Sequence, residues 1–163
     1  DEGVRGEVTP VDLTALIQHC VQKLTPAAQN AQVSISASGN DPVLISGDHA
    51  LLEEMLTNLL ENGIKYNHAG GYVRARAEMA DGRAVVTVAD NGVGIAPEDQ
   101  QRVFERFYRV DKSRSKQTGG TGLGLSIVKH GAQVHHAQIA MQSALGDGTT
   151  ITLTFPAQSS GKK

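Results

Sequence analysis

The segment YVRARAEMADGRAVVTVAD, residues 72–90, decides the fold class of this 163-residue chain. Its first part, YVRARAEM (72–79), strictly alternates apolar and polar residues, as a half-buried β-strand does. ADGR then gives a turn signal, and AVVTVAD (84–90) alternates again. The segment therefore predicts an antiparallel hairpin, with the second strand the more buried of the two.

The residues before the hairpin predict two helices and two short strands. Residues 11–30 carry apolar side chains at helical spacing, and Pro26 is expected to disturb or end the regular part. VSISAS (33–38) and PVLISG (42–47) are the predicted strands. Asp48 is a suitable N-cap for the second helix, which continues into the middle sixties.

The residues after the hairpin predict a long functional loop, a helix and a final pair of strands. Gly92 to Gly124 is rich in glycine and basic residues and has no sustained period. A structureless stretch of that length is typical of function. Residues 123–136 can form a helix, QIAMQS and TTITLTF (149–155) the strands, and the tail 157–163 is expected to be disordered.

This order of elements predicts one domain over residues 1–163 of the α+β class. We expect one mixed, mostly antiparallel sheet of about five strands, with helices on one face. Hydrophobic residues make up 39% of the chain and aromatic residues only 4%, so the core must be aliphatic.

Composition also narrows the function classes. The formal net charge of −2 gives no electrostatic reason to expect nucleic-acid binding. Cys20 is the only cysteine, which argues against disulfides and fits a reducing, cytoplasmic compartment. No apolar run approaches the ~18 residues of a membrane span, and there is no signal peptide. Because the chain starts without Met, we expect a piece of a longer parent, which leaves room for a membrane segment there.

The segment from Arg102 to Lys116 contains six basic residues and only two acidic ones. That excess suits an anionic ligand, and it equally suits a solvated loop.

The stretch NLLENGIKYN (58–67) places polar residues where a helix is expected. On a helix, Asn58, Asn62, Lys65 and Tyr66 fall within about 100° of one another, at the edge of the apolar stripe. Amide oxygens can bind a hard cation, and the Lys and Tyr add a positive charge and a hydroxyl. These residues predict a site for a metal-bound polyphosphate; the alternative is that both asparagines are incidental surface residues.

Two glycine-bearing segments favour the ligand-binding interpretation. Asp90 ends a buried strand and is followed by NGVG, so its carboxylate can accept a hydrogen bond from an exocyclic amine while backbone approaches a flat ligand. TGGTGLGLS (118–126) leads into a helix, whose N-terminus can cradle phosphates. It is neither a Walker A loop nor a Rossmann fingerprint. A flexible linker is disfavoured because its neighbours Leu123, Leu125, Ile127 and Val128 are apolar.

Four motifs, in register, resemble the sequence boxes of sensor histidine kinases. NLLENGIKYN resembles the N box, DNGVGI (90–95) the G1 box, FERFYRVD (104–111) the F box and GTGLGL (120–125) the G2 box. The resemblance covers the catalytic, ATP-binding domain over roughly residues 8–156. It implies the Bergerat fold, a two-layer α/β sandwich also seen in gyrase, MutL and ninety-kilodalton heat-shock chaperones.

The resemblance implies transfer of the γ-phosphoryl group of Mg-ATP to a histidine on a separate dimerisation domain, for relay to a response regulator. By this resemblance, Asp90 binds the adenine amino group, and Asn62 and Asn58 hold Mg²⁺. Residues 96–121 would form a mobile ATP lid in which Arg109 reaches the γ-phosphate, so Asn58 and Arg109 are the expected catalytic residues. The other implied nucleotide contacts are Lys65, Tyr66, Gly92, Gly94, Ile95, Tyr108, Gly120, Thr121, Gly122, Leu123, Gly124 and Leu125.

The histidines bear on two points, the missing phosphoacceptor and one departure from the family pattern. None of its six histidines stands in a phosphoacceptor motif, so it should not autophosphorylate alone. The family often reads HGG before the last hairpin, whereas residues 135–137 read HHA and lack the glycine turn. His135 and His136 invite a metal interpretation, but adjacent residues point to different sides of a helix.

Three other functions compete with a histidine kinase. An ATPase of the gyrase or MutL kind would carry a Glu at position 58, and Asn58 cannot act as a base for water. A non-catalytic module with a decayed site would not keep these motif positions intact. A serine-directed kinase shares the fold, but FYRVD with a long basic lid favours the histidine class. We therefore expect a cytoplasmic domain of a homodimeric, membrane-bound sensor, itself without nucleic-acid or direct membrane contact.

Overall fold

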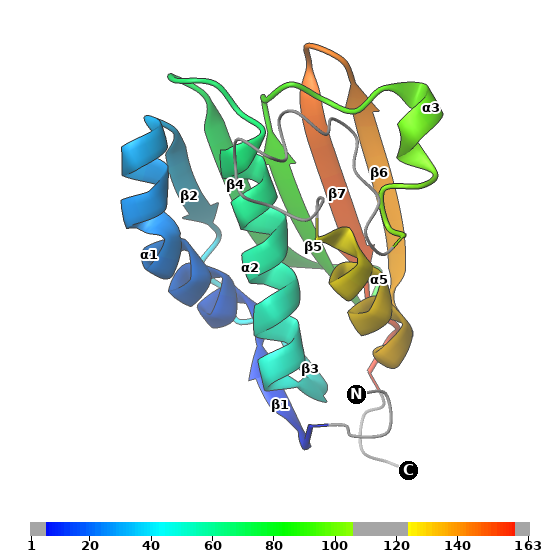
Figure 1. The fold of residues 1–163 in the computed structure, drawn as a ribbon. Helices are drawn as coiled ribbons and strands as arrows, with labels where there is room; N and C mark the ends of the chain where they lie inside the picture. The colour runs from blue at the N-terminus through cyan, green and yellow to red at the C-terminus, as the bar shows by residue number, and fades with distance from the viewer. Residues whose placement is uncertain (1–5, 106–123, 159–163) are drawn as a thin grey trace.

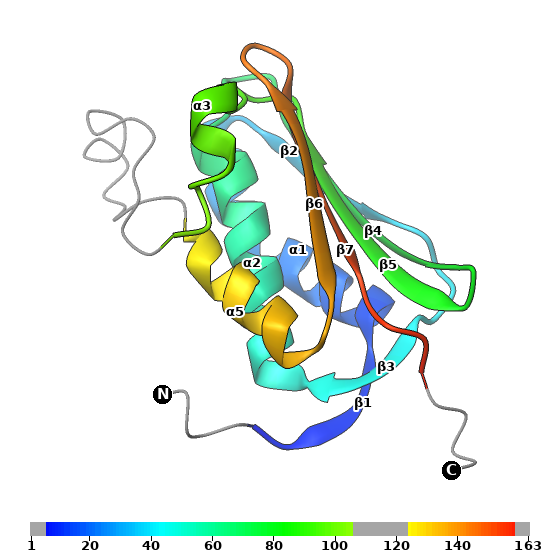
Figure 2. The same ribbon diagram turned by 90° about the vertical axis from the view of Figure 1, so that its right-hand side faces the viewer.

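A five-stranded sheet covered by helices on one face forms the body of the protein (Figures 1 and 2). The computed structural model describes residues 6–105 and 124–158. Within them the sheet order is β2 (Ser34–Ser38), β4 (Tyr72–Ala80), β5 (Arg83–Asp90), β7 (Gly148–Thr154) and β6 (Gln138–Ala144). β2 and β4 run parallel and the other neighbours antiparallel. The predicted α+β class and mixed sheet are confirmed.

The hairpin β4–β5 lies at the centre of the sheet and has the predicted register. Val73 faces Asp90 at one end, and Ala80 faces Arg83 beside the turn. Asp81 and Gly82 both take positive φ, 54° and 78°, as a two-residue type I′ turn requires. β5 is the more buried strand because β7 pairs with it over residues 85–90, whereas β2 pairs with β4 only over residues 72–76.

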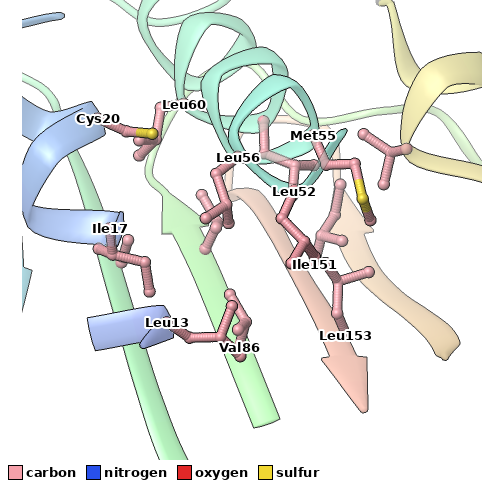
Figure 3. Packing of buried hydrophobic residues seen from close by; sticks show 14 of the residues in the cluster. Leu13, Ile17, Cys20, Leu52, Met55, Leu56, Leu60, Val86, Ile151 and Leu153 are labelled. Carbon is pink, nitrogen blue, oxygen red and sulfur yellow. The ribbon is translucent and has the colours of Figure 1, made fainter. Parts of the chain in front are cut away.

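The helical layer consists of α1 (Leu13–Ala31), α2 (His49–Lys65) and α5 (Leu125–Val134). Asp48 caps α2 as predicted, since its Oδ1 accepts the Leu51 N–H at 3.1 Å. The core between the layers is aliphatic, as expected. Figure 3 shows the facing side chains Leu13, Ile17, Cys20, Leu52, Met55, Leu56, Leu60, Val86, Ile151 and Leu153.

Close packing against β4 explains why α2 carries a glycine, Gly63, near its C-terminal end. A β-carbon there would lie 2.8 Å from both methyl carbons of Val73 on β4. The glycine therefore lets the last turn of α2 approach the sheet closely enough to bring its polar residues beside the end of β5.

Three predictions about elements were wrong. α1 continues through Pro26 to Ala31, because Leu24 and Ala28 on either side of the proline are buried in the core. β3 (Leu44–Asp48) leaves the main sheet and pairs with β1 (Val8–Asp12), a strand that the sequence did not predict. A short helix, α3 (Pro97–Gln100), lies in the stretch that has no sustained period.

The HHA segment forms its turn without glycine. His136 adopts the left-handed conformation, with φ 56°, in the middle position of that motif. The His135 ring bridges two elements: Nε2 accepts the Asp48 N–H at 3.0 Å, and Nδ1 lies 2.8 Å from the Gly131 oxygen. Both ring nitrogens of His135 therefore interact with backbone groups of other residues.

No helix in the described ranges is both long enough and apolar enough to cross a bilayer.

Candidate functional site

A pocket of about 280 Å³ opens between the C-terminal half of α2 and the neighbouring ends of β5 and β7. Its walls are mostly apolar, with a few polar groups converging on it, which is the usual composition of a small-molecule site. The lining residues are Leu59, Asn62, Gly63, Tyr66, Val88, Asp90, Val93, Gly94, Ile95, Leu125, Leu145, Thr149 and Ile151.

Asp90 presents a half-buried carboxylate to this pocket from the last position of β5. Its Oδ1 accepts the Gly92 N–H at 2.8 Å. Burial raises the pKa of Asp90, and hydrogen bonds from the backbone of Gly92 and Thr149 oppose that rise. The apolar pocket thus holds a fixed hydrogen-bond acceptor, which suits the amine of a flat, mostly apolar ligand.

The loop after Asp90 is attached on two sides. Val93 donates its N–H to the Tyr66 oxygen at 2.9 Å, which links the loop to the end of α2. Ile95 donates its N–H to Ser143 Oγ at 2.8 Å, which links the loop to β6. Gly94 has φ 76°, and a β-carbon there would collide with the Ala144 carbonyl, so this position requires glycine.

The four polar residues predicted on α2 separate into two groups. Asn62 and Tyr66 line the pocket, whereas Lys65 is exposed and does not line it. Asn58 lies one turn earlier, outside the pocket, with its Oδ1 3.9 Å from where a β-carbon of Gly124 would stand. Asn58 and Asn62 therefore follow a line from the pocket toward the start of α5.

The N-terminus of α5 closes this side of the site. Gly124 occupies the N-cap with φ 72°, and Leu125 lines the pocket. The N-terminus of the ten-residue helix α5 therefore lies beside Asn58. The free backbone N–H groups at such a helix end favour the binding of anions. Asn58, beside this helix end, and Asn62, in the pocket, are half-buried amides and a chemically suitable pair for a hard cation that bridges phosphates.

Several predicted site residues lie outside the described residues: Tyr108, Arg109, Gly120, Thr121, Gly122 and Leu123. The same holds for residues 106–121 of the expected lid and 159–163 of the tail. In the part of the lid segment that is described, Val103 is buried in the core. The assignment of each site residue stays a prediction.

The sequence interpretation missed the far wall of the pocket. Thr149 and Ile151 come from β7, and Leu145 from the turn that precedes it. Alternation in TTITLTF could have marked Ile151 as inward-facing. Nothing in the local sequence showed that Thr149 pairs with Asp90 across the β5–β7 ladder.

Comparisons with known proteins agree with this geometry. Residues 47–159 match the family described as histidine kinase-, DNA gyrase B-, and HSP90-like ATPase. The sensor-like histidine kinase SenX3 of Mycolicibacterium smegmatis is 42% identical over 150 residues, which is 92% of this chain and 39% of that protein. The phosphate regulon sensor protein PhoR of Pseudomonas aeruginosa is 40% identical over 157 residues, or 94% of this chain and 35% of PhoR.

A solved structure extends the likeness to three dimensions. The mycobacterial sensor histidine kinase MprB matches with a TM-score of 0.77 and 29% identity, covering 93% of this chain and 99% of that one. The chain spans 39% and 35% of the length of the two curated relatives, so it corresponds to one part of such proteins. It belongs to the histidine kinase-, DNA gyrase B- and HSP90-like ATPase family, as the catalytic domain of the sensor histidine kinase type.

Proposed function

We propose that the chain binds Mg-ATP in the pocket beside α2 and transfers its γ-phosphoryl group to a histidine on a dimerisation domain of the same parent protein. One observation carries this proposal. A half-buried carboxylate stands at the apolar end of the pocket, and two amides lead from that pocket to a helix N-terminus. This arrangement suits a purine at one end and a triphosphate at the other.

Each end of the site would do a different part of the work. Asp90 would accept a hydrogen bond from the adenine amine, and the apolar walls would exclude water from the base. Asn62 and Asn58 would hold Mg²⁺, which when bound neutralises charge on the phosphates. The N–H groups at the start of α5 and the glycines before it would orient the phosphates, so that transfer depends on positioning and charge.

The proposal extends to the parent protein. The acceptor histidine, the dimer contacts and the response regulator that receives the phosphoryl group would all lie outside this chain. We place it as a cytoplasmic domain of a membrane-bound sensor, with no nucleic-acid partner. Arg109 would stabilise the transferring group, and Asn58 in place of a base would keep ATP hydrolysis slow.

Calorimetric titration with a non-hydrolysable ATP analogue tests the proposal, with and without Mg²⁺. We expect micromolar to sub-millimolar affinity with Mg²⁺, and weaker binding when the metal is chelated. Asn62→Ala should lose most of this metal dependence. Asn30→Ala, at an exposed position on α1, is the matched control and should behave as wild type. Absence of binding at millimolar nucleotide would refute the proposal.

A second measurement addresses the reaction itself. Incubated with labelled ATP, the chain alone should retain no label on histidine and should turn ATP over slowly. Label should appear on the dimerisation domain of the parent when that domain is supplied. Rapid ATP turnover by the chain alone would favour the gyrase type of ATPase instead.

A further inference from the structure

Asn67 is buried between α2 and β4, and both the nitrogen and the oxygen of its side-chain amide form hydrogen bonds. It is 8% exposed, one of the few buried polar residues in the described part of the chain. Its Nδ2 donates to the Tyr72 oxygen at 3.0 Å and lies 3.4 Å from Asn91 Oδ1, while its Oδ1 accepts the His68 N–H at 2.8 Å. A single amide thus joins the end of α2 to the start of β4 and the end of β5.

Asn91 completes the junction from the other side. Its Oδ1 accepts the Tyr72 N–H at 2.6 Å, and its own N–H points to the Tyr72 oxygen at 3.4 Å. The paired residues of β4 and β5 end at Val73 and Asp90. Asn67 and Asn91 therefore continue the attachment of the two strands one residue past the ladder, where the chain turns away from the sheet. We call these two residues the amide clamp.

The clamp adjoins both the Asp90 acceptor and the pocket wall on α2. Asp90 is the residue directly before Asn91, and Tyr66 on the pocket wall is directly before Asn67. Neither clamp residue lines the pocket itself. A shift at the clamp would displace the Asp90 carboxylate relative to the pocket wall on α2. Its hydrogen bond to a ligand amine would then be weaker, because hydrogen-bond strength falls steeply with poor alignment.

We propose that Asn67 and Asn91 are positioning residues that set the preference of the pocket for a base with an exocyclic amine. This inference rests on the proposed function, because it assumes that Asp90 receives that amine. A buried amide can also simply stabilise the fold. The two roles differ in what they do to the choice between ligands, because loss of stability alone lowers the binding of every ligand in the same proportion.

The test compares two triphosphates that differ in one group: ATP, and purine riboside triphosphate, which lacks the exocyclic amine. The ratio of their dissociation constants is independent of the folded fraction of the sample. In the wild-type chain we expect ATP to bind at least ~10-fold more tightly, the lower end for a hydrogen bond to a charged group. In Asn67→Ala the ratio should fall at least threefold.

Two further variants keep the outcome decisive. Asn91→Ala, at a half-buried position, removes the same clamp if Asn67→Ala does not fold, and should lower the ratio equally. Leu24→Ala truncates a buried residue of α1 away from the pocket, so it should reduce stability and leave the ratio unchanged. A wild-type ratio retained in both clamp variants overturns the inference alone. A wild-type chain that binds neither nucleotide, or both equally, overturns the assignment of Asp90 and the inference with it.

Discussion

Replacement of Asp90 by asparagine should weaken adenine nucleotides and at the same time stabilise the nucleotide-free protein. The carboxylate is half-buried among apolar residues, and burial raises its pKa. At neutral pH, burial of the ionised Asp90 carboxylate therefore lowers the free energy of unfolding. The uncharged amide of asparagine has nearly the same shape and avoids this cost. An amide is a weaker acceptor and also donates, so it is a poor match for the adenine amine.

The structure gives the size of the binding effect. A hydrogen bond to a charged group contributes about 1.5–3 kcal/mol, which corresponds to roughly 10–150-fold in dissociation constant. Among the described residues that line the pocket, Asp90 is the only charged one, so we expect a loss of at least ~10-fold for ATP. The Gly92 N–H keeps an acceptor in the variant, because the asparagine oxygen takes the place of Oδ1.

The pH dependence of stability has a definite sign. Because the pKa of Asp90 is higher in the folded state than in the unfolded state, the stability that this group contributes is complete below the unfolded pKa. It is lost as the pH rises through the folded pKa. The stabilising effect of Asp90→Asn should therefore be largest at neutral pH and should shrink as the pH falls into the acid range of an aspartate.

Thermal denaturation at several pH values and calorimetric titration with an ATP analogue measure the two effects separately. Asp41→Asn removes one carboxylate at an exposed position that is distant from Asp90 in the sequence, so it is the matched control. The reasoning fails if Asp90→Asn binds ATP as wild type does. It also fails if the variant is less stable than wild type at neutral pH.

Three other substitutions test separate parts of the structure. Gly94→Ala should cost at least about 1–2 kcal/mol of unfolding free energy and most nucleotide binding, because φ is 76° and a β-carbon meets β6; thermal denaturation measures it. His135→Ala should lose about 1–3 kcal/mol in urea denaturation, since it leaves the buried Asp48 N–H without its acceptor, and His130→Ala on the exposed side of α5 should change little. Arg109→Ala in the full-length parent should slow autophosphorylation at saturating ATP at least ~30-fold, about 2 kcal/mol of barrier, with ATP affinity lowered only a few-fold. A rate restored by more ATP would argue against a transition-state role for Arg109.

Local patterns in the sequence determined most of the elements. Alternation and the ADGR turn predicted the β4–β5 hairpin because strand faces repeat every two residues and a type I′ turn needs particular residue types. Asp48 as a helix cap follows from the same kind of short-range rule. The motif resemblance identified the family, since four motifs in register specify far more than any one of them.

The tertiary structure decided what depends on residues far apart in the chain. Pro26 stays inside α1 because the core holds the helix on both sides of it, which outweighs a local preference to break. β1 forms a strand because β3 is there to pair with it. Asp90 pairs with Thr149 across the β5–β7 ladder, and it lines the same pocket as Asn62, which comes from α2. Periodicity indicates which face of an element is buried, but only packing decides which buried faces meet, and the pocket and the amide clamp both lie where they meet.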